Sequence, residues 1–291
     1  MSNFKKAILI KTYARVAIFG PSGNGKTYTS LQLSKGLANS GKIALIDTER
    51  GSSTKYSDIF DFDVLELSEF NPQNYINGIN EAVGEGYSVL IIDSLSHAWE
   101  GKGGILDLHD EAIAKQKIKN SFTAWKDVTP LHRKLVDALI SAPLHIIVTM
   151  RSKTEYVIDK NEYGKSQVRK LGLKPIQREG LEYEFDIVGD MSDQYSWVIS
   201  KSRYAPFSGK IIPKPIPSTG EEILAWVTKG TSQENVLAEQ KNEIQRLIKN
   251  RLINYEERSR INHMLTTNCS LKDLDKTINI LSNWIKNRRI V

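Results

Sequence analysis

The stretch GPSGNGKT occupies residues 20–27, directly after the apolar run 15–19 and at the start of the helix-like stretch 26–38. It fits the pattern GxxxxGK followed by Ser or Thr, in the strand–loop–helix context that gives this pattern its meaning. Glycines allow the backbone to curl, so that its N–H groups and the N-terminus of the following helix face one anion. The stretch therefore predicts a phosphate-binding loop within an α/β fold.

This loop is expected to hold a nucleotide together with Mg²⁺. Lys26 would neutralise the β and γ phosphates, and the hydroxyl of Thr27 would ligate the metal. No N-K-x-D segment, which would bind a guanine base, follows a core strand, so ATP is the expected nucleotide. The predicted nucleotide contacts are Gly20, Pro21, Ser22, Gly23, Asn24, Gly25, Lys26 and Thr27.

Short apolar runs alternate with helical patterns along the chain. The runs 15–19, 43–47, 89–93 and 145–149 predict buried strands, and residues 183–188 and 195–200 predict further strands. Helix-like stretches lie between them at residues 26–38, 74–83 and 131–140. This alternation predicts an α/β fold with a mostly parallel sheet flanked by helices on both faces.

The chain changes character near three closely spaced prolines. Pro213, Pro215 and Pro217 are excluded from a central strand, and residues 228–233, TKGTSQ, are polar and turn-prone. Beyond them, Ser270 with Asp273 three positions later is typical of a helix N-cap, and apolar residues follow at helical spacing. We expect an N-terminal segment of residues 1–13, an α/β core of residues 14–230 and a small C-terminal helical domain of residues 231–291.

Composition limits the class of protein. The 291 residues, 40% of them apolar, can close a core, but the longest apolar runs are far shorter than the roughly 20 residues of a membrane span. Cys269 is the only cysteine, and the five histidines show no metal-ligand spacing. These features predict a cytoplasmic protein without a membrane helix or structural zinc. The net charge of +6 permits an acidic partner such as nucleic acid without requiring one.

Two carboxylates follow predicted strands at the edge where the phosphate loop lies. Asp93 ends the apolar run in SVLIIDSLS, where a carboxylate can hold Mg²⁺ through water. Glu49 follows the strand in IALIDTER, where a carboxylate can polarise an attacking water. Acids at strand ends also serve solubility, so position alone leaves the role of Glu49 open.

The order of the segments GPSGNGKT, LIDTERG, LIIDSLS, HIIVTMRSK and VISKSRYAPF resembles the ATPase core of RecA and related recombinases. In that family the acid after the second strand is the catalytic glutamate, which implies this role for Glu49. TAWKDVTPLHRKLVDAL and KPIQREGLEYEFDIVGDM are similar to compact RecA-like ATPases of bacteriophages, some of which are single-strand annealing recombinases. The similarity covers about residues 14–230 and implies the cytoplasm of a bacterial host if the chain is phage-encoded.

Thr149 departs from the family pattern. The family has a glutamine there that senses the γ-phosphate, and the shorter hydroxyl of Thr149 would have to reach the nucleotide through water. Arg151 retains the family's basic position. Its role is left open between nucleotide sensing, DNA sensing and an ordinary surface arginine.

Proteins of this family bind single-stranded DNA with two loops, which correspond here to residues 97–128 and 152–178. Residues 151–178 contain eight Lys or Arg and three Asp or Glu, a net charge of +5 that would attract phosphates without reading sequence. A solvated loop can carry the same excess. The residues expected to contact DNA are Arg151, Lys153, Lys165, Arg169, Lys170 and Lys174.

The segment VISKSRYAPF is similar to the family segment in which two lysines stabilise phosphates across a subunit interface. Side chains two positions apart on a strand share a face, so Lys201 and Arg203 are expected to converge on one anion. The resemblance implies a catalytic role for both in trans, within a head-to-tail homo-oligomer that forms a ring or a filament.

Taken together, these patterns predict an ATP-hydrolysing recombinase or annealing protein that binds single-stranded DNA, with ATP and Mg²⁺ as cofactors. A small-molecule P-loop kinase and an ATP-switched regulatory module are alternatives. A kinase would usually need an arginine-rich lid, and the sequence contains none. Glu49 argues against a regulatory module that binds ATP without hydrolysing it. The C-terminal domain is expected to contact DNA, to bind a partner such as a single-strand DNA-binding protein, or to cap the core.

Overall fold

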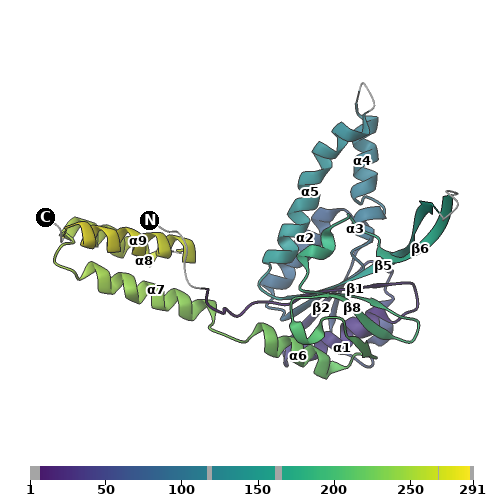
Figure 1. Cartoon of the computed structure of the whole chain (residues 1–291), viewed down its shortest axis with the longest axis horizontal. Coiled ribbons are helices and arrows are strands. Elements are labelled where there is room, and N and C mark those ends of the chain that lie inside the picture. The colour runs from purple at the N-terminus through teal and green to yellow at the C-terminus, as the bar shows by residue number, and fades with distance from the viewer. Residues whose placement is uncertain (1–6, 117–119, 161–165, 268, 289–291) are drawn as a thin grey trace. The chain divides into compact units, whose positions relative to one another are not determined.

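The computed structural model describes residues 7–116, 120–160, 166–267 and 269–288, apart from the side chains of residues 156–171 and 233. The chain divides into two units (Figure 1). The larger comprises Tyr13–Val227, and the smaller combines Met1–Thr12 with Thr228–Val291. Within the smaller unit, the N–H of Lys11 donates to the carbonyl of Thr231, and the N–H of Thr231 donates to the carbonyl of Leu9.

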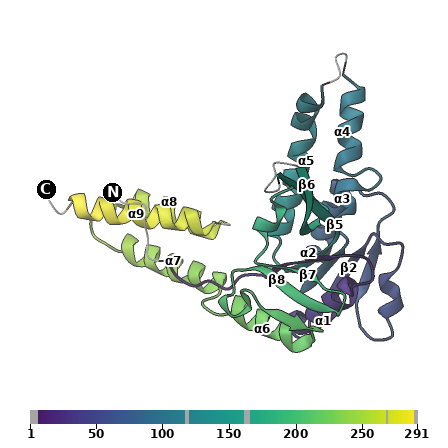
Figure 2. The same cartoon turned by 45° about the vertical axis from the view of Figure 1, so that its right-hand side comes forward.

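A sheet forms the centre of the larger unit and contains nine strands of the described residues (Figures 1 and 2). The strands are β1 (Arg15–Gly20), β2 (Ile43–Asp47), β3 (Asp63–Glu66), β4 (Val89–Asp93), β5 (His145–Lys160), β6 (Ser166–Pro175), β7 (Ile187–Met191), β8 (Ser196–Ser202) and β9 (Ile211–Pro213). Their order is β3-β2-β4-β5-β1-β7-β8-β9, with β6 paired to β5 beside this path. The six strands from β3 to β7 in that order run parallel, whereas β8 is antiparallel to both of its neighbours, β7 and β9. The predicted α/β class with a mostly parallel sheet is confirmed.

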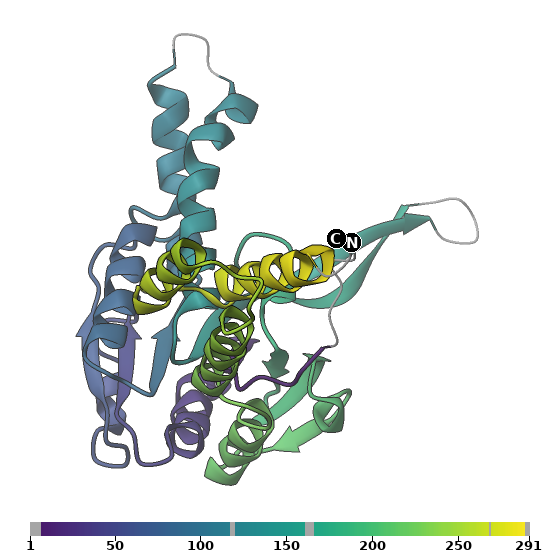
Figure 3. The same ribbon diagram turned by 90° about the vertical axis from the view of Figure 1, so that its left-hand side faces the viewer.

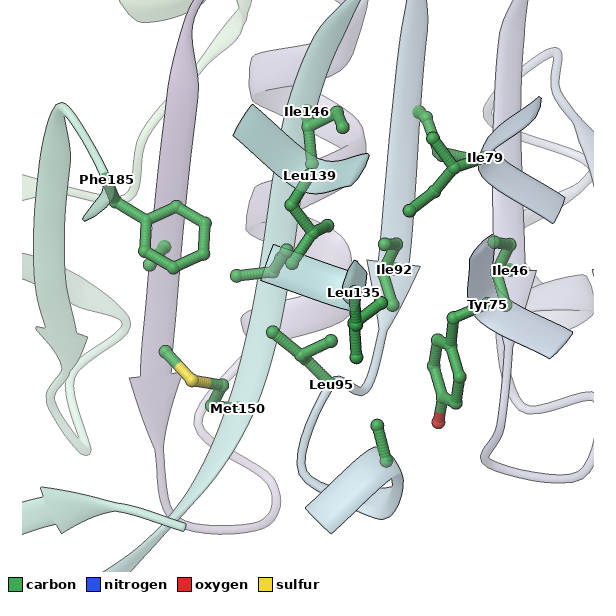
Figure 4. Close-up of a cluster of buried hydrophobic side chains, with 14 of the residues drawn as sticks. Ile46, Tyr75, Ile79, Ile92, Leu95, Leu135, Leu139, Ile146, Met150 and Phe185 are labelled. Atoms are coloured by element: carbon green, nitrogen blue, oxygen red, sulfur yellow. The ribbon is translucent and has the colours of Figure 1, made fainter. Parts of the chain in front are cut away.

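Helices α2 (Pro72–Gly84) and α5 (Ser121–Ser141) cover one face of this sheet. Their buried apolar residues pack onto side chains that alternate along the strands, which is why the strands are apolar on both faces. Figure 4 shows this layer, with Tyr75 and Ile79 from α2 and Leu135 and Leu139 from α5 over Ile46, Ile92 and Ile146 of the sheet. Truncating one of these leucines to alanine would cost about 2–5 kcal/mol.

Helices α1 (Lys26–Ala38) and α6 (Pro217–Val227) cover the opposite face. They approach each other closely, because a Cβ on Gly36 would overlap the carbonyl oxygen of Pro217 and a Cβ on Gly220 would overlap that of Leu33. Helix α6 begins at Pro217, a first-turn position that proline favours because its missing N–H is not needed there. The last of the three closely spaced prolines therefore starts a helix of the core.

Two hairpins stand away from the sheet, where loops were expected (Figure 3). The described residues 97–116 and 120–128 contain α3 (His97–Glu100), α4 (Ile105–Ala114) and the start of α5, so the expectation of a loop there is wrong. Asn120 accepts hydrogen bonds from the N–H groups of Phe122 and Thr123 and so caps α5. Residues 152–160 and 166–175 are likewise not a loop, because β5 continues past Thr149 and pairs with β6, from Ser152 opposite Pro175 to Lys160 opposite Ser166.

The strand expected at residues 183–188 begins later than the pattern indicated. Residues Leu181–Glu184 form a 3-10 turn, η2, and β7 starts at Ile187. Gly180 precedes the turn with φ +89°, a conformation that turns the chain before the strand can begin. Two further 3-10 turns are η1 (Ser53–Tyr56) and η3 (Ala205–Phe207).

The smaller unit contains α7 (Gln233–Ile248), α8 (Tyr255–Thr266) and α9 (Leu271–Arg288). They enclose a core of their own, formed by Ile244, Ile248, Ile253, Leu274, Leu281 and Ile285. The predicted N-cap of α9 is present, since the N–H of Asp273 donates to Oγ of Ser270 and the N–H of Ser270 donates to Asp273. Over the described ranges, no helix is both long enough and apolar enough to cross a membrane.

Candidate nucleotide site

The carboxyl ends of the parallel strands lie at one edge of the sheet. The strand register places Gly20 beside Arg151 and Asp47 beside Asp93. A cavity of about 1170 Å³ opens at this edge, and its wall includes Lys26, Thr27, Glu49, Asp93 and Arg151. Residues that are distant in the sequence therefore meet at one site, as expected for the carboxyl edge of an open α/β sheet.

The loop between β1 and α1 has the backbone that its glycines predict. Gly23 and Gly25 have φ values of +84° and +79°, which side chains rarely adopt. Helix α1 follows without a side-chain N-cap, so the N–H groups of its first turn are available to an anion. Pro21 and Asn24 do not line the cavity, unlike the other predicted loop contacts. Asn24 instead donates to the carbonyl of Met191 at 2.9 Å and ties the loop to β7.

Lys26 lies within this loop. Its Nζ donates to the carbonyls of Gly20 at 2.9 Å and Pro21 at 2.7 Å. Burial lowers the pKa of Lys26, and the nearby carboxylates of Asp93 and Glu49 partly offset that effect. Phosphate oxygens are stronger acceptors than neutral carbonyls, so the ammonium group is suited to exchange these partners for a nucleotide phosphate.

Asp93 is held by two threonine hydroxyls. Thr27 donates to its Oδ2, and Thr149 donates to its Oδ1. The carboxylate is almost wholly buried, which raises the pKa of Asp93, and the two hydroxyls act in the opposite direction. Thr149 is itself fully buried and does not line the cavity. It therefore contacts the predicted metal ligand and is not the nucleotide contact that the sequence had suggested.

The residues at this point fit Mg²⁺. Thr27 and Asp93 offer only oxygen donors, which is the ligand type that Mg²⁺ prefers. In the part of the chain that the structure describes, no group of three or more His, Cys, Asp and Glu side chains could hold a metal. A magnesium ion held by Thr27 and Asp93 would therefore take its other ligands from substrate phosphates and water, as is usual for this ion.

Glu49 is positioned by the turn that follows β2. The carboxylate of Asp47 accepts hydrogen bonds from the N–H groups of Glu49, at 2.6 Å, and of Ser53, at 3.0 Å. This local pattern fixes the backbone of Glu49 at the cavity wall. The structure thus brings the predicted base and the predicted phosphate and metal residues to one cavity.

Arg151 forms a two-pronged ion pair with Glu49. Its Nε lies 3.0 Å from Oε1 and its Nη2 lies 2.6 Å from Oε2. These hydrogen bonds raise the pKa of Arg151 above its ordinary value, although burial acts against them. The sequence grouped Arg151 with the DNA-contacting residues, and the structure places its side chain in the cavity wall.

Four of the other five candidate DNA contacts belong to strands β5 and β6. Lys153 and Lys174 are paired across the two strands. Lys174 already forms ion pairs of 3.3 Å with Glu155 and Glu179. Arg169 and Lys170 belong to β6, but their side chains lie outside the described part of the structure, and Lys165 lies outside it altogether.

Lys201 and Arg203 lie at the opposite edge of the sheet, because β8 is antiparallel to β7 and starts beside the phosphate loop. Nζ of Lys201 donates to the carbonyls of Glu182, Tyr183 and Phe185. Arg203 forms an ion pair of 2.9 Å with Asp186. Neither residue lines the cavity, so the structure does not bring them to the nucleotide site of their own chain.

The cavity also has a wall that no motif indicated. Tyr195 lies in the turn between β7 and β8, and Lys214, Pro215 and Ile216 follow β9. These residues belong to the antiparallel end of the sheet, where no contiguous pattern links them to the phosphate loop. Tyr28 and Tyr56 extend the same cavity.

A family model described as an AAA domain matches residues 12–210. The chain belongs to this AAA domain family. The match spans β1 to β8 and contains the phosphate loop, Glu49, Asp93 and Arg151, whereas the cavity residues that follow β9 lie beyond it. The P-loop of this AAA domain implies nucleotide binding.

Two curated relatives are similar to part of this chain. One is the DNA repair and recombination protein RadB of Thermococcus sibiricus, which is 31% identical over 94 residues, or 28% of this chain and 40% of that protein. The other is the protein of the same name from Pyrococcus horikoshii, 28% identical over 102 residues, or 30% of this chain and 43% of that protein. The matches thus span less than half the length of either relative.

Proposed function

We propose that this chain hydrolyses ATP and acts on DNA in repair or recombination. The observation that carries the proposal is the position of Glu49 on the same cavity wall as Lys26 and the Thr27–Asp93 pair. A nucleotide-binding module that only switches partners has no need of a carboxylate at this point. The similarity to the two RadB proteins, which are described as DNA repair and recombination proteins, supports the DNA part of the proposal.

The residues divide the reaction between them. The loop N–H groups and Lys26 bind and orient the phosphates, because a fixed positive charge stabilises the transferring phosphoryl group. Glu49 orients a water molecule for attack on the γ-phosphate and takes its proton. Thr27 and Asp93 hold Mg²⁺, which would neutralise charge that develops on the phosphate oxygens.

The finer part of the proposal concerns the kind of DNA. We expect single-stranded DNA, bound along the hairpin of β5 and β6, because residues 151–178 carry a net charge of +5. The segments that resemble compact bacteriophage ATPases favour strand annealing or strand pairing as the reaction. The ion pairs of Lys174 with Glu155 and Glu179 reduce the support from that residue.

Assembly in a head-to-tail ring or filament is also part of the proposal. Lys201 and Arg203 lie at the edge of the sheet opposite the phosphate loop, so they can act on a nucleotide only if it is bound by a neighbouring chain. A charge supplied in this way resembles an arginine finger, which contributes about 10³–10⁵ in rate.

Turnover of Mg·ATP by the purified chain, measured with and without single-stranded DNA, tests the proposal. We expect hydrolysis that single-stranded DNA stimulates. Binding of ATP without hydrolysis under either condition would overturn the enzymatic part. Hydrolysis that DNA leaves unchanged, with no binding of DNA, would overturn the DNA part alone.

A further inference from the structure

The ion pair between Arg151 and Glu49 occupies the group that the reaction needs. Both oxygens of the Glu49 carboxylate accept hydrogen bonds from the guanidinium, at 3.0 and 2.6 Å. A general base must accept a hydrogen bond from the water that it activates, and the guanidinium already occupies a hydrogen-bonding position on each of the two oxygens. The pair as observed therefore opposes the role of Glu49 as a base.

The backbone of Arg151 is fixed by two hydrogen bonds, whereas its side chain is partly exposed to solvent. The N–H of Arg151 donates to Oγ of Ser96 at 2.9 Å, and its carbonyl accepts from the N–H of Ile176 at 2.7 Å. The Arg151 side chain is nevertheless 45% exposed to solvent, and the Glu49 side chain is 27% exposed. An ion pair with this much solvent exposure is weak compared with a buried one, so another anion can compete for the guanidinium.

A phosphate of a bound nucleotide is the anion that would compete with Glu49 for Arg151. In the sheet register Arg151 lies beside Gly20, the first residue of the phosphate loop, and both line the cavity. The planar guanidinium fork matches phosphate oxygens as well as it matches a carboxylate. A γ-phosphate carries more negative charge than a carboxylate and would be bound next to the Lys26 ammonium.

We propose that Arg151 is a γ-phosphate sensor that clamps Glu49 until ATP binds and then exchanges the carboxylate for the γ-phosphate, which releases Glu49 to act as the base. This inference rests on the proposed ATPase function. It makes hydrolysis depend on the same interaction that distinguishes ATP from ADP. Arg151 is thereby a nucleotide ligand and a positioning residue for Glu49.

A double-mutant cycle on nucleotide binding tests the exchange. Binding of Mg·ADP and of the non-hydrolysable analogue Mg·AMP-PNP is measured for the wild type, Arg151→Ala, Glu49→Gln and the double variant. We expect Arg151→Ala to weaken AMP-PNP binding by about 10- to 100-fold, because the variant cannot form the charge-assisted hydrogen bonds to the γ-phosphate, and to change ADP binding less than about twofold. Arg133→Ala, an exposed arginine of α5 outside the cavity wall, is the matched control and should bind both nucleotides normally.

Glu49→Gln gives the decisive comparison, because it removes the partner that holds Arg151 away from the nucleotide. We expect it to tighten AMP-PNP binding by about 3- to 10-fold, and only while Arg151 is present. Equal tightening in the Arg151→Ala background, or equal loss of ADP and AMP-PNP binding in Arg151→Ala, would overturn the exchange. A wild-type chain that binds neither nucleotide would instead refute the proposed function, so the two failures are distinguishable.

Discussion

The hydroxyl of Thr149 donates a hydrogen bond to Oδ1 of Asp93, and Oδ2 of the same carboxylate accepts from Thr27. Asp93, the predicted metal ligand at the end of β4, is thus held from two sides, by Thr149 of β5 and by Thr27 of α1. Thr149 stands where the RecA family has glutamine. In this structure its hydroxyl positions Asp93, a role that does not require contact with the nucleotide.

Thr149→Val should impair this arrangement without changing the volume of the core. The buried carboxylate loses one donor, and a hydrogen bond to a charged group contributes about 1.5–3 kcal/mol. We expect a lower free energy of unfolding and a higher Mg²⁺ concentration for half-maximal ATP turnover, measured by chemical denaturation and by Mg²⁺ titration. Thr149→Ser retains the hydroxyl and should preserve the Mg²⁺ dependence. A valine variant with wild-type Mg²⁺ dependence would show that Thr149 does not position Asp93.

His145 provides a prediction for pH. Its Nδ1 accepts a hydrogen bond from the N–H of Ala14 at 3.1 Å, and burial together with the charge of Arg15 lowers the pKa of His145 from 6.5 to about 4. As the pH falls, His145 is protonated in the unfolded chain at a higher pH than in the folded chain. The contribution of neutral His145 to the free energy of unfolding is therefore complete above pH 6.5 and is lost as the pH falls from 6.5 to about 4. The loss would reach about 3 kcal/mol over this range.

Denaturation curves at several pH values for the wild type and for His145→Asn measure this effect. Asparagine can still accept from the N–H of Ala14 but cannot take up a proton. The stability of the variant should therefore fall less steeply between pH 6.5 and 4 than that of the wild type. Parallel pH profiles would show that His145 titrates normally in the folded chain.

The sequence predicted those parts of the fold and site that depend on contiguous patterns. Strands 43–47 and 89–93 and helix 26–38 have the bounds that their apolar runs and the phosphate-loop motif indicated. Helix α4 and the first half of α5 were missed because a family resemblance suggested a loop, although Asn120 provides an ordinary N-cap, whereas residues 131–140 of α5 were predicted as a helix. Strand β3 gave no signal, since all four of its residues are exposed at the edge of the sheet.

The contacts of the site could not be predicted, because they join distant residues. Arg151 and Glu49 are 102 positions apart, and only the parallel order of β2, β4 and β5 brings them together. Lys201 and Arg203 were expected to converge on an external anion. In this chain they contact backbone carbonyls and Asp186, which no periodicity in the sequence indicates.

Neutralising four basic residues between positions 165 and 174 should weaken binding of single-stranded DNA. The variant changes Lys165, Arg169, Lys170 and Lys174 to alanine. A chain that neutralises fewer phosphates releases fewer counterions, so the slope of log K against log salt should become less steep by up to about 0.7 for each phosphate that is no longer neutralised. A control variant replaces four exposed lysines elsewhere on the same unit, namely Lys35, Lys42, Lys55 and Lys210. An equal change in slope for both variants would show that these four residues are not part of the DNA-binding site.

Catalysis in trans can be tested by mixing two inactive variants. Lys26→Ala lacks an intact phosphate loop, and the double change Lys201→Ala with Arg203→Ala lacks the charges that would reach a neighbouring chain. Co-assembled mixtures should regain part of the ATP turnover, because some interfaces combine an intact loop with an intact pair. Arg203→Ala alone serves as the control for folding, since its side chain is 55% exposed whereas Lys201 supports three carbonyls. Mixtures no more active than either variant, despite confirmed co-assembly, would exclude the trans role.

Hydrolysis of ATP with Glu49 as the base is tested most directly by comparing nucleotide binding and phosphate release in the wild type and Glu49→Gln. Glutamine keeps the shape of the side chain and loses the basic oxygen, and general-base catalysis contributes about 10²–10⁴ in rate. The expected result is a variant that binds Mg·ATP at least as tightly as the wild type and releases phosphate at least about 100-fold more slowly. A variant that hydrolyses ATP at the wild-type rate, or one in which binding and hydrolysis fall together, would contradict the assignment of Glu49 as the base.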